Sequence, residues 1–147
     1  MAQNSKFYIA ADHAGYELKQ HLINKFPELK IEDLGTHNPD RVDYPDFADR
    51  VAIKIESDSN AVGILVCGSG QGMAIRANRY PKVRAALCWS EEVAQLSREH
   101  NNANILCLGS RFTAPALAEL ILKKFLSTEF EGGRHTGRVD KLGRPNC

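Results

Sequence analysis

The sequence has 147 residues, a length that suits one domain whose core is large enough to fold without disulfides or structural metal ions. Its 19 Lys and Arg residues nearly balance its 18 Asp and Glu residues, which argues against a chain-wide attraction to nucleic acid or to an anionic membrane. The polar start, MAQNSK, leads into an apolar run too short for a signal peptide or a membrane span, so a cytoplasmic protein is expected.

The cysteines exclude two further classes of protein. Cys67, Cys88, Cys107 and Cys147 form no Cys-x-x-Cys pair. The first three lie in or beside apolar runs, where a reduced thiol packs as a small hydrophobic side chain. We therefore expect neither a disulfide framework nor a zinc site.

Short apolar runs alternate with longer helical patterns along the chain. The runs are residues 7–11, 30–34, 62–66, 84–88 and 104–108, and the second alternates apolar with polar residues like an edge strand. This alternation predicts parallel strands joined by crossover helices. The expected fold is α/β: a three-layer α/β/α Rossmann-like open sheet of five parallel strands.

Five helices are expected between and after these strands. Proline cannot continue a helix, so the first helix should stop at Pro27, whereas Pro45 suits the first turn of the second. The third helix covers about 73–77, and Ser90 and Thr113 are candidate N-caps of the fourth and fifth. The expected buried positions are Leu18, Leu22, Ile23 and Phe26 in the first helix, Phe47, Val51 and Ile55 in the second, and Leu117, Leu120, Ile121 and Phe125 in the last.

The last eighteen residues, 130–147, read FEGGRHTGRVDKLGRPNC and have too little apolar content for a core of their own. We expect one domain spanning 1–147, with an extended tail that docks elsewhere or stays loose. Arg134 and Arg138 each follow a glycine and suit the binding of one phosphate by two guanidinium groups; a solvated tail is the alternative. A nucleic-acid arm is a poorer interpretation, because Glu131 and Asp140 dilute its four basic residues.

A glycine-rich turn follows the central apolar run, in the stretch AVGILVCGSGQGMAIRAN at 61–78. Glycine at alternate positions permits backbone angles forbidden to other residues, so successive N–H groups can converge on an anion at the positive end of the next helix. The turn therefore predicts an anionic ligand. Its residues are Gly68, Ser69, Gly70, Gln71 and Gly72.

Spacing argues against a nucleotide. A P-loop needs lysine after the second glycine, and a tyrosine-phosphatase loop needs arginine six residues after the cysteine, but Met73 occupies both positions. The glycines also lack the spacing of a dinucleotide turn, and Cys88 and Trp89 stand where an acidic residue should close the next strand.

Ligands of open parallel sheets bind beyond the carboxyl ends of the strands, near the point where the strand order reverses. Asp12 and His13 follow the first predicted strand, the glycine turn the third and Arg111 the fifth, so we expect them on one rim. His100 lies at a helix end near the opposite rim, unless a second subunit supplies it. The alternative for both histidines is a helix-end residue without a role.

Cys67 lies where the predicted strand gives way to the glycine turn and a helix. A thiol at the start of a helix can act as a thiolate base or nucleophile. A thiol that is only packed is the alternative.

Five motifs together resemble the type B ribose-5-phosphate isomerase family and cover nearly the whole chain. They are AADHAGYELK at 10–19, DLGTHN with VDYPDFA within 33–48, CGSGQGMAIRAN at 67–78, HNNANILCLGSR at 100–111 and FEGGRHTGRVDKL at 130–142. Galactose-6-phosphate isomerase subunits share parts of these motifs. The resemblance implies interconversion of ribose 5-phosphate and ribulose 5-phosphate without metal or organic cofactor.

The resemblance also implies roles. Cys67 would be the base, Ser69 the hydroxyl that relays protons between substrate oxygens, and His100 the acid that opens the furanose ring, while the amides of 68–72 would hold the enediolate. Some relatives use a glutamate base, but Ile75 or Arg76 occupies that position here. The implied substrate ligands are Asp12 and Asn101 for hydroxyls and His13, Arg111, Arg134 and Arg138 for the phosphate.

Family members are dimers or tetramers whose sites mix two subunits, so a homo-oligomer is implied, with the tail of 130–147 closing a site across the subunit interface. Two other functions stay open. One is isomerisation of a six-carbon substrate such as allose or galactose 6-phosphate. The other is a phosphosugar-binding module without catalysis.

Overall fold

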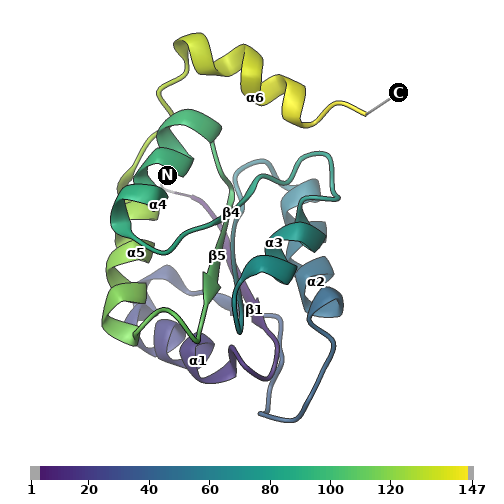
Figure 1. Ribbon diagram of the computed structural model, residues 1–147, viewed down its shortest axis with the longest axis vertical. Helices are drawn as coiled ribbons and strands as arrows, with labels where there is room; N and C mark the ends of the chain where they lie inside the picture. The colour runs from purple at the N-terminus through teal and green to yellow at the C-terminus, as the bar shows by residue number, and fades with distance from the viewer. Residues whose placement is uncertain (1–3, 146–147) are drawn as a thin grey trace.

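The structure, a computed structural model, describes residues 4–145 and contains a five-stranded parallel sheet (Figure 1). Its strands lie in the order β2-β1-β3-β5-β4, and each neighbouring pair is parallel. The predicted α/β class is confirmed. The strands are β1 (Phe7–Ala11), β2 (Glu32–Asp33), β3 (Val62–Cys67), β4 (Ala85–Leu87) and β5 (Ile105–Gly109).

Helices cover both faces of this sheet, with α1, α4 and α5 on one face and α2 and α3 on the other (Figure 1). Within the described residues, no helix has the length and hydropathy that a bilayer crossing needs. The helices are α1 (Tyr16–Lys25), α2 (Tyr44–Ser57), α3 (Gln71–Ala77), α4 (Glu91–Asn101), α5 (Pro115–Ser127) and α6 (Thr136–Leu142), with single 3-10 turns η1 (Pro27–Leu29) and η2 (Gly133–His135).

The central strands are buried on both faces, as parallel strands between two helical layers must be. All six residues of β3 are buried. Gly63 in that strand allows α2 to approach closely, because a Cβ there would lie 2.5 Å from Cγ1 of Val51 and 2.9 Å from Cγ1 of Ile105. The apolar runs thus form two clusters, one on each face, that fix the sheet between its helices.

Three helix predictions have clear outcomes. Ser90 is the N-cap of α4, and its hydroxyl accepts a hydrogen bond from the N–H of Val93 at 3.2 Å, as predicted. Thr113 is not the cap of α5: the N-cap is Ala114, and Thr113 is buried. Leu120 was expected to be buried but is 46% exposed, because the buried stripe of α5 consists of Ala118, Ile121, Leu122 and Phe125.

The tail differs from the extended segment that the sequence predicts. It contains η2 and the short helix α6, which lies across the edge of the sheet where the strands begin (Figure 1). A Cβ at Gly143, just after α6, would lie 2.7 Å from the carbonyl oxygen of Pro81. Helix α6 buries none of its residues, so it has no apolar stripe from which it could be predicted.

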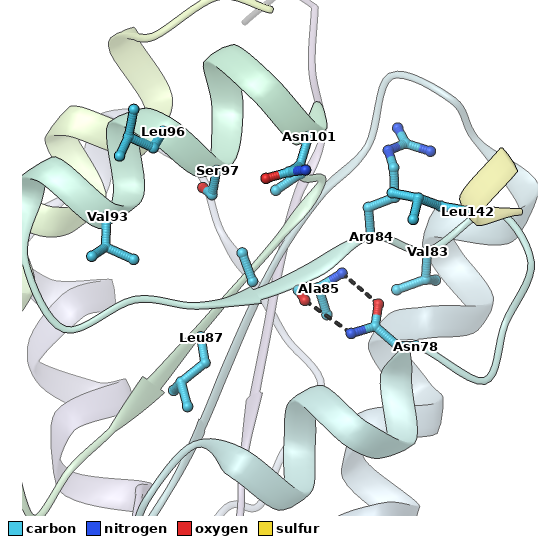
Figure 2. Close-up of a pocket in the computed structure, with 12 residues that line it drawn as sticks. Asn78, Val83, Arg84, Ala85, Leu87, Val93, Leu96, Ser97, Asn101 and Leu142 are labelled. Carbon is cyan, nitrogen blue, oxygen red and sulfur yellow. Dashed lines mark hydrogen bonds between the residues drawn. The ribbon is translucent and has the colours of Figure 1, made fainter. Parts of the chain in front are cut away.

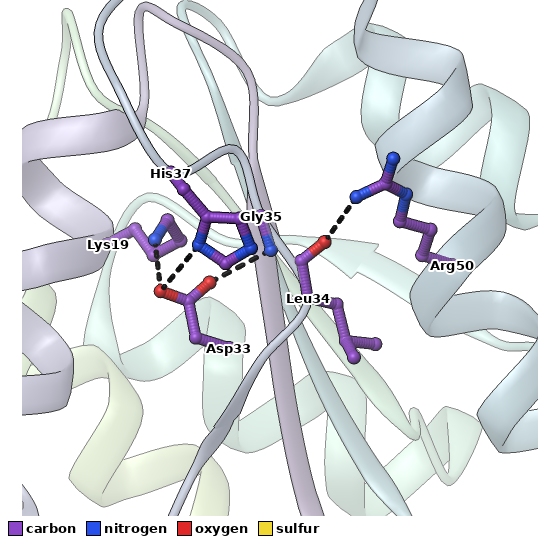
Figure 3. A network of polar contacts seen from close by, with 6 residues as sticks. All are labelled: Lys19, Asp33, Leu34, Gly35, His37 and Arg50. Carbon is purple, nitrogen blue, oxygen red and sulfur yellow. Dashed lines mark hydrogen bonds and ion pairs between the residues drawn. The ribbon is translucent and has the colours of Figure 1, made fainter.

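A partly buried ion pair between Lys19 and Asp33 fixes the loop that follows β2 (Figure 3). The ammonium group of Lys19 is fully buried and lies 2.6 Å from Oδ2 of Asp33, whose other oxygen accepts a hydrogen bond from the N–H of Gly35 at 2.9 Å. His37 approaches the same carboxylate at 3.8 Å, and the guanidinium of Arg50 donates to the carbonyl of Leu34. The start of the loop between β2 and α2, residues 34–43, is therefore tied to α1 and α2.

Replacing Asp33 with alanine is expected to lower the free energy of unfolding by about 3 kcal/mol, because Lys19 would keep a buried charge without its partner. Urea denaturation measures the change. The matched control is Glu32→Ala, which removes an exposed carboxylate from the same strand and should cost less than about 0.5 kcal/mol. Adding Lys19→Met to Asp33→Ala should recover much of the loss, and equal stability of the two single variants would contradict the role of the pair.

Candidate active site

A cleft of about 270 Å³ opens at the carboxyl ends of β1 and β3. The strand order reverses here, since the chain goes from β1 to β2 on one side and continues from β3 on the other. The cleft brings together seven of the predicted site residues with two others. Its lining residues are Asp12, His13, Ala14, Tyr44, Cys67, Gly68, Ser69, Gly72 and Arg111.

Cys67, the last residue of β3, is 5% exposed and lines the cleft. Its sulfur accepts a hydrogen bond from the N–H of Gly70 at 3.2 Å. Gly70 has a φ of 77°, and a Cβ there would lie 2.5 Å from Cδ1 of Leu87, so only glycine makes this turn without strain. The turn thus directs the positive end of an amide dipole at the sulfur.

Arg111 reaches the same cleft from the end of β5. The register pairs Cys67 with Gly109, which places Arg111 beside the turn, where its N–H donates to the carbonyl of Gly68 at 3.0 Å. The guanidinium carbon lies 3.2 Å from the position of a Cβ at Gly68, so a side chain at residue 68 would displace it. Arg111 is exposed and can bind an anion in the cleft.

Asp12 and His13 hold fixed positions at the end of β1. Asp12 is buried, and its Oδ1 accepts a hydrogen bond from the N–H of Gly15 at 3.0 Å. The Nδ1 of His13 accepts from the N–H of Val42 at 3.2 Å, so a neutral ring carries its proton on Nε2. The loop around Val42 therefore prepares His13 to donate a hydrogen bond to a ligand.

Tyr44 also lines the cleft, but it was not among the predicted site residues. It begins α2, and its ring covers Gly72: a Cβ at Gly72 would lie 2.3 Å from Cε1 of Tyr44. A single aromatic residue at a helix start adds nothing to a periodic pattern. The only available signal was its place inside the VDYPDFA motif.

Two residues of the glycine turn do not line the cleft. Gly70 is buried behind it, and Gln71 is exposed and borders a separate hollow with Trp89 and Phe112. The N–H groups of both residues already donate within the turn, to Sγ of Cys67 and to Oγ of Ser69 at 3.4 Å. Two of the amides of 68–72 thus already form hydrogen bonds within the turn. That these amides hold an enediolate stays a prediction.

Ile75 and Arg76, which stand where the resemblance implies a glutamate base in some family members, offer no acid. Ile75 is 67% exposed, and the guanidinium of Arg76 forms two hydrogen bonds, of 2.7 and 3.1 Å, with the carboxylate of Asp49. Arg76, and to a lesser degree the hydroxyl of Tyr80, hold the pKa of Asp49 below its usual range. Asp49 is therefore an ionised partner of Arg76, and neither lines the cleft.

Two other thiols lie in the core and do not reach the cleft. Burial raises the pKa of Cys88 to about 11, and it raises the pKa of Cys107 well above the ordinary value of a thiol. Both are therefore neutral near pH 7 and pack as small apolar groups. Cys147 lies outside the described residues.

The remaining predicted residues lie at the other end of the sheet, where the strands begin. His100 and Asn101 end α4, just before β5 begins, whereas Arg134 and Arg138 lie in η2 and α6 and are exposed. A strand of five residues spans roughly 16 Å, so one chain does not bring these side chains to Cys67. Docking of the tail at a site across a subunit interface stays a prediction.

A groove runs along the edge strand β4, between α3 and α4 (Figure 2). Its volume is about 540 Å³, and Leu87, Val93 and Leu96 give it an apolar wall. Asn78 closes one side by exchanging hydrogen bonds of 2.8 and 2.9 Å with the backbone of Ala85. Figure 2 shows Asn101 at the rim of this groove, so the groove reaches the edge of the sheet that carries His100.

An open parallel sheet with a small polar cleft at its switch point places this chain among the Rossmann-like proteins that bind small molecules. Comparison with known families narrows the class. A family model described as Ribose/Galactose Isomerase matches residues 7–142, and the chain belongs to that family.

Relatives agree with this membership. Ribose-5-phosphate isomerase B of Escherichia coli strain K12 is 39% identical over 139 residues, which are 93% of each chain. The crystal structure of a ribose 5-phosphate isomerase from Thermotoga maritima has a TM-score of 0.91 and 46% identity, covering 97% of this chain and 99% of that one. A structure from Mycoplasma genitalium with bound ribulose-5-phosphate has a TM-score of 0.90 and 43% identity, covering 96% and 95%.

Proposed function

We propose that this protein interconverts D-ribose 5-phosphate and D-ribulose 5-phosphate through a cis-enediolate, without a metal or an organic cofactor. The observation that carries the proposal is the sulfur of Cys67 in a cleft that also holds Arg111 and His13, two donors suited to a phosphate. Family membership and the similar Mycoplasma genitalium structure with bound ribulose-5-phosphate support the choice of substrate.

Binding of the sugar phosphate uses the fixed groups of the cleft. The guanidinium of Arg111 and the Nε2–H of His13 would bind the phosphate. Asp12 uses one carboxylate oxygen to accept from Gly15, so its other oxygen can accept a hydrogen bond from a sugar hydroxyl. These contacts would hold the open-chain sugar with its reactive carbons near the sulfur of Cys67.

The chemistry is a proton transfer between two carbons. The thiolate of Cys67 would remove the proton from C2 of the aldose, and the electron pair of that bond would form the C1–C2 double bond while the carbonyl electrons move to O1. The hydroxyl of Ser69 would carry a proton from O2 to O1, and the Cys67 thiol would then return its proton to C1. The N–H of Gly70, already directed at the sulfur, would stabilise negative charge there.

We further propose that a second copy of the chain completes the site. Four predicted residues lie where the strands of their own sheet begin, far from the cleft: His100, Asn101, Arg134 and Arg138. They would supply what the cleft lacks, which is an acid for ring opening and two more guanidinium groups. The apolar groove along β4 borders this end of the sheet, and β4 leaves one side of the sheet unpaired. A homodimer, alone or within a tetramer, would bury the groove and bring these residues to the partner's cleft.

A six-carbon substrate is the second candidate, because the description of the matching family names galactose beside ribose. Allose 6-phosphate and galactose 6-phosphate are the substrates to compare.

Incubation in heavy water is expected to give ribulose 5-phosphate from ribose 5-phosphate with solvent deuterium bound to carbon, because the thiol exchanges its proton during the enediolate stage. Nuclear magnetic resonance of the sugar measures both events. The kcat/KM for ribose 5-phosphate should exceed those for allose and galactose 6-phosphates by at least about tenfold, since the extra carbon must fit the same cleft. Binding without interconversion or exchange would identify a non-catalytic module, and a reversed preference would identify the six-carbon isomerase.

A further inference from the structure

Three side chains that can ligate a metal ion meet at the end of α4, at the end of the sheet where the strands begin and away from Cys67. They are His100 in the last turn of that helix, Glu131 in the segment after α5, and His135 at the end of η2. One ligand atom from each lies within 4.8 Å of the other two. Sequence analysis did not predict this cluster, because thirty residues separate its parts and no metal-binding spacing links them.

Backbone hydrogen bonds hold the cluster together. The N–H of Glu131 donates to the carbonyl of Glu99 at 3.1 Å, which ties the segment after α5 to the last turn of α4. Nε of Arg98 donates to the carbonyl of Thr128 at 3.1 Å and fixes the start of the same segment. The side chains of Glu131 and His135 are therefore placed beside His100 by the fold itself.

His135 has an unused ligand atom. The residue is only 6% exposed, and its Nε2 makes no hydrogen bond within the described part of the chain. A buried imidazole nitrogen without a partner is unfavourable, so such an atom is expected to have a ligand, an ion or a water molecule. The carboxylate of Glu131 lies 3.4 Å away, measured between Nε2 and Oε2, and forms an ion pair with His135 when the imidazole is protonated.

The spacing suits a tetrahedral ion. Ligand atoms at 2.0–2.2 Å from zinc lie about 3.4 Å from each other, which is the separation of the His135 nitrogen and the Glu131 oxygen. His100 stacks on His135 with ring centroids 4.5 Å apart and an angle of 16° between the planes. Because a metal lies in the plane of the imidazole that binds it, the partly exposed ring of His100 must rotate to complete the set.

The local electric field also favours a cation. His100 belongs to the C-terminal turn of α4, where the carbonyl groups give the helix its negative end, and Glu131 adds a carboxylate. The nearby cation Arg98 directs its guanidinium to the carbonyls of Ala103 and Thr128 and to the side chain of Asn102. These neutral acceptors fix the position of the Arg98 guanidinium, which keeps its positive charge.

We propose that His100, Glu131 and His135 bind one divalent transition-metal ion, with Zn²⁺ as the best fit to two imidazoles and a carboxylate, leaving a fourth position open. The ion is not needed for the isomerisation. The consequence for activity rests on the proposed function: an occupied site withdraws His100 from ring opening, so the metal would act as a reversible inhibitor.

Calorimetric titration of chelator-treated protein with Zn²⁺ tests the site without reference to activity, and Co²⁺ absorption reports the ligand geometry. One equivalent is expected to bind to the native protein and at least about tenfold more weakly to His135→Phe and Glu131→Gln. The matched control is His21→Gln, which removes the histidine of another pair, with Nε2 2.9 Å from Oε2 of Glu119. Cys67→Ala is the second control, because the cleft thiol is itself a possible ligand. Both controls should bind like the native protein.

Equal affinity in all five proteins, loss of binding only in Cys67→Ala, or no stoichiometric binding to the native protein would each overturn the site. If His135→Phe does not fold, Glu131→Gln decides, because that residue is exposed. In the native protein Zn²⁺ should lower isomerase activity and a chelator should restore it, whereas Glu131→Gln should resist the inhibition. A protein that binds Zn²⁺ as expected but has no isomerase activity would contradict the proposed function and leave the metal site in place.

Discussion

Replacing Cys67 with alanine is expected to lower kcat for ribose 5-phosphate by about a thousandfold, because the variant loses the group that moves a proton between C2 and C1. Cys67 is the only cysteine among residues 4–145 that lines the cleft. The phosphate ligands Arg111 and His13 remain, so the dissociation constant for ribulose 5-phosphate should change less than about threefold. A coupled assay measures kcat, and calorimetry measures binding.

Cys88→Ala is the matched control for that substitution. Cys88 is also a buried free thiol, but it packs in the core cluster on the other face of the sheet, and burial raises its pKa to about 11. Its loss should change kcat by no more than about twofold and lower stability by about 1 kcal/mol. Turnover of Cys67→Ala within tenfold of the native protein would remove the sulfur from the mechanism.

The sequence predicted the rim of the cleft because two independent regularities coincide there. Apolar runs locate the parallel strands, and polar residues such as Asp12, Cys67 and Arg111 come directly after them. The carboxyl ends of parallel strands lie at the same end of a sheet, and these residues meet there because β1, β3 and β5 are neighbours in the strand order. The place of β4 outside β5 in that order was not predicted, because apolar runs locate the strands but do not rank them across the sheet.

Contacts between distant loops were beyond such reasoning. His13 accepts a hydrogen bond from Val42, and Tyr44 covers Gly72, yet none of these pairs follows a helical or strand period. The packing of His135 against His100 depends on where α5 ends and on the path of the segment that follows it. Such positions are set by tertiary packing, which overrides local pattern. Strand β2 is also shorter than the expected run of 30–34, because Lys30 adopts a φ of 50° at the end of η1 and cannot belong to a strand.

Mixing two inactive variants is expected to restore activity if two chains share each site. In a dimer of Cys67→Ala with His100→Ala, one cleft carries both substitutions and the other carries neither, because each cleft would take its thiol from one chain and its imidazole from the other. Random association makes half of the dimers mixed, and each has one intact site out of two. The mixture should therefore reach about a quarter of the native activity per site.

Refolding the two variants together from denaturant allows their chains to exchange, and the same coupled assay follows the recovery. The matched control is Cys67→Ala mixed with Arg111→Ala, because these two residues line the same cleft of one chain and a mixed dimer keeps no intact site. Recovery with His100→Ala but not with Arg111→Ala would show that the end of α4 serves the partner's cleft. If neither mixture recovers, His100 acts within its own chain, and the groove along β4 is not the contact that completes the site.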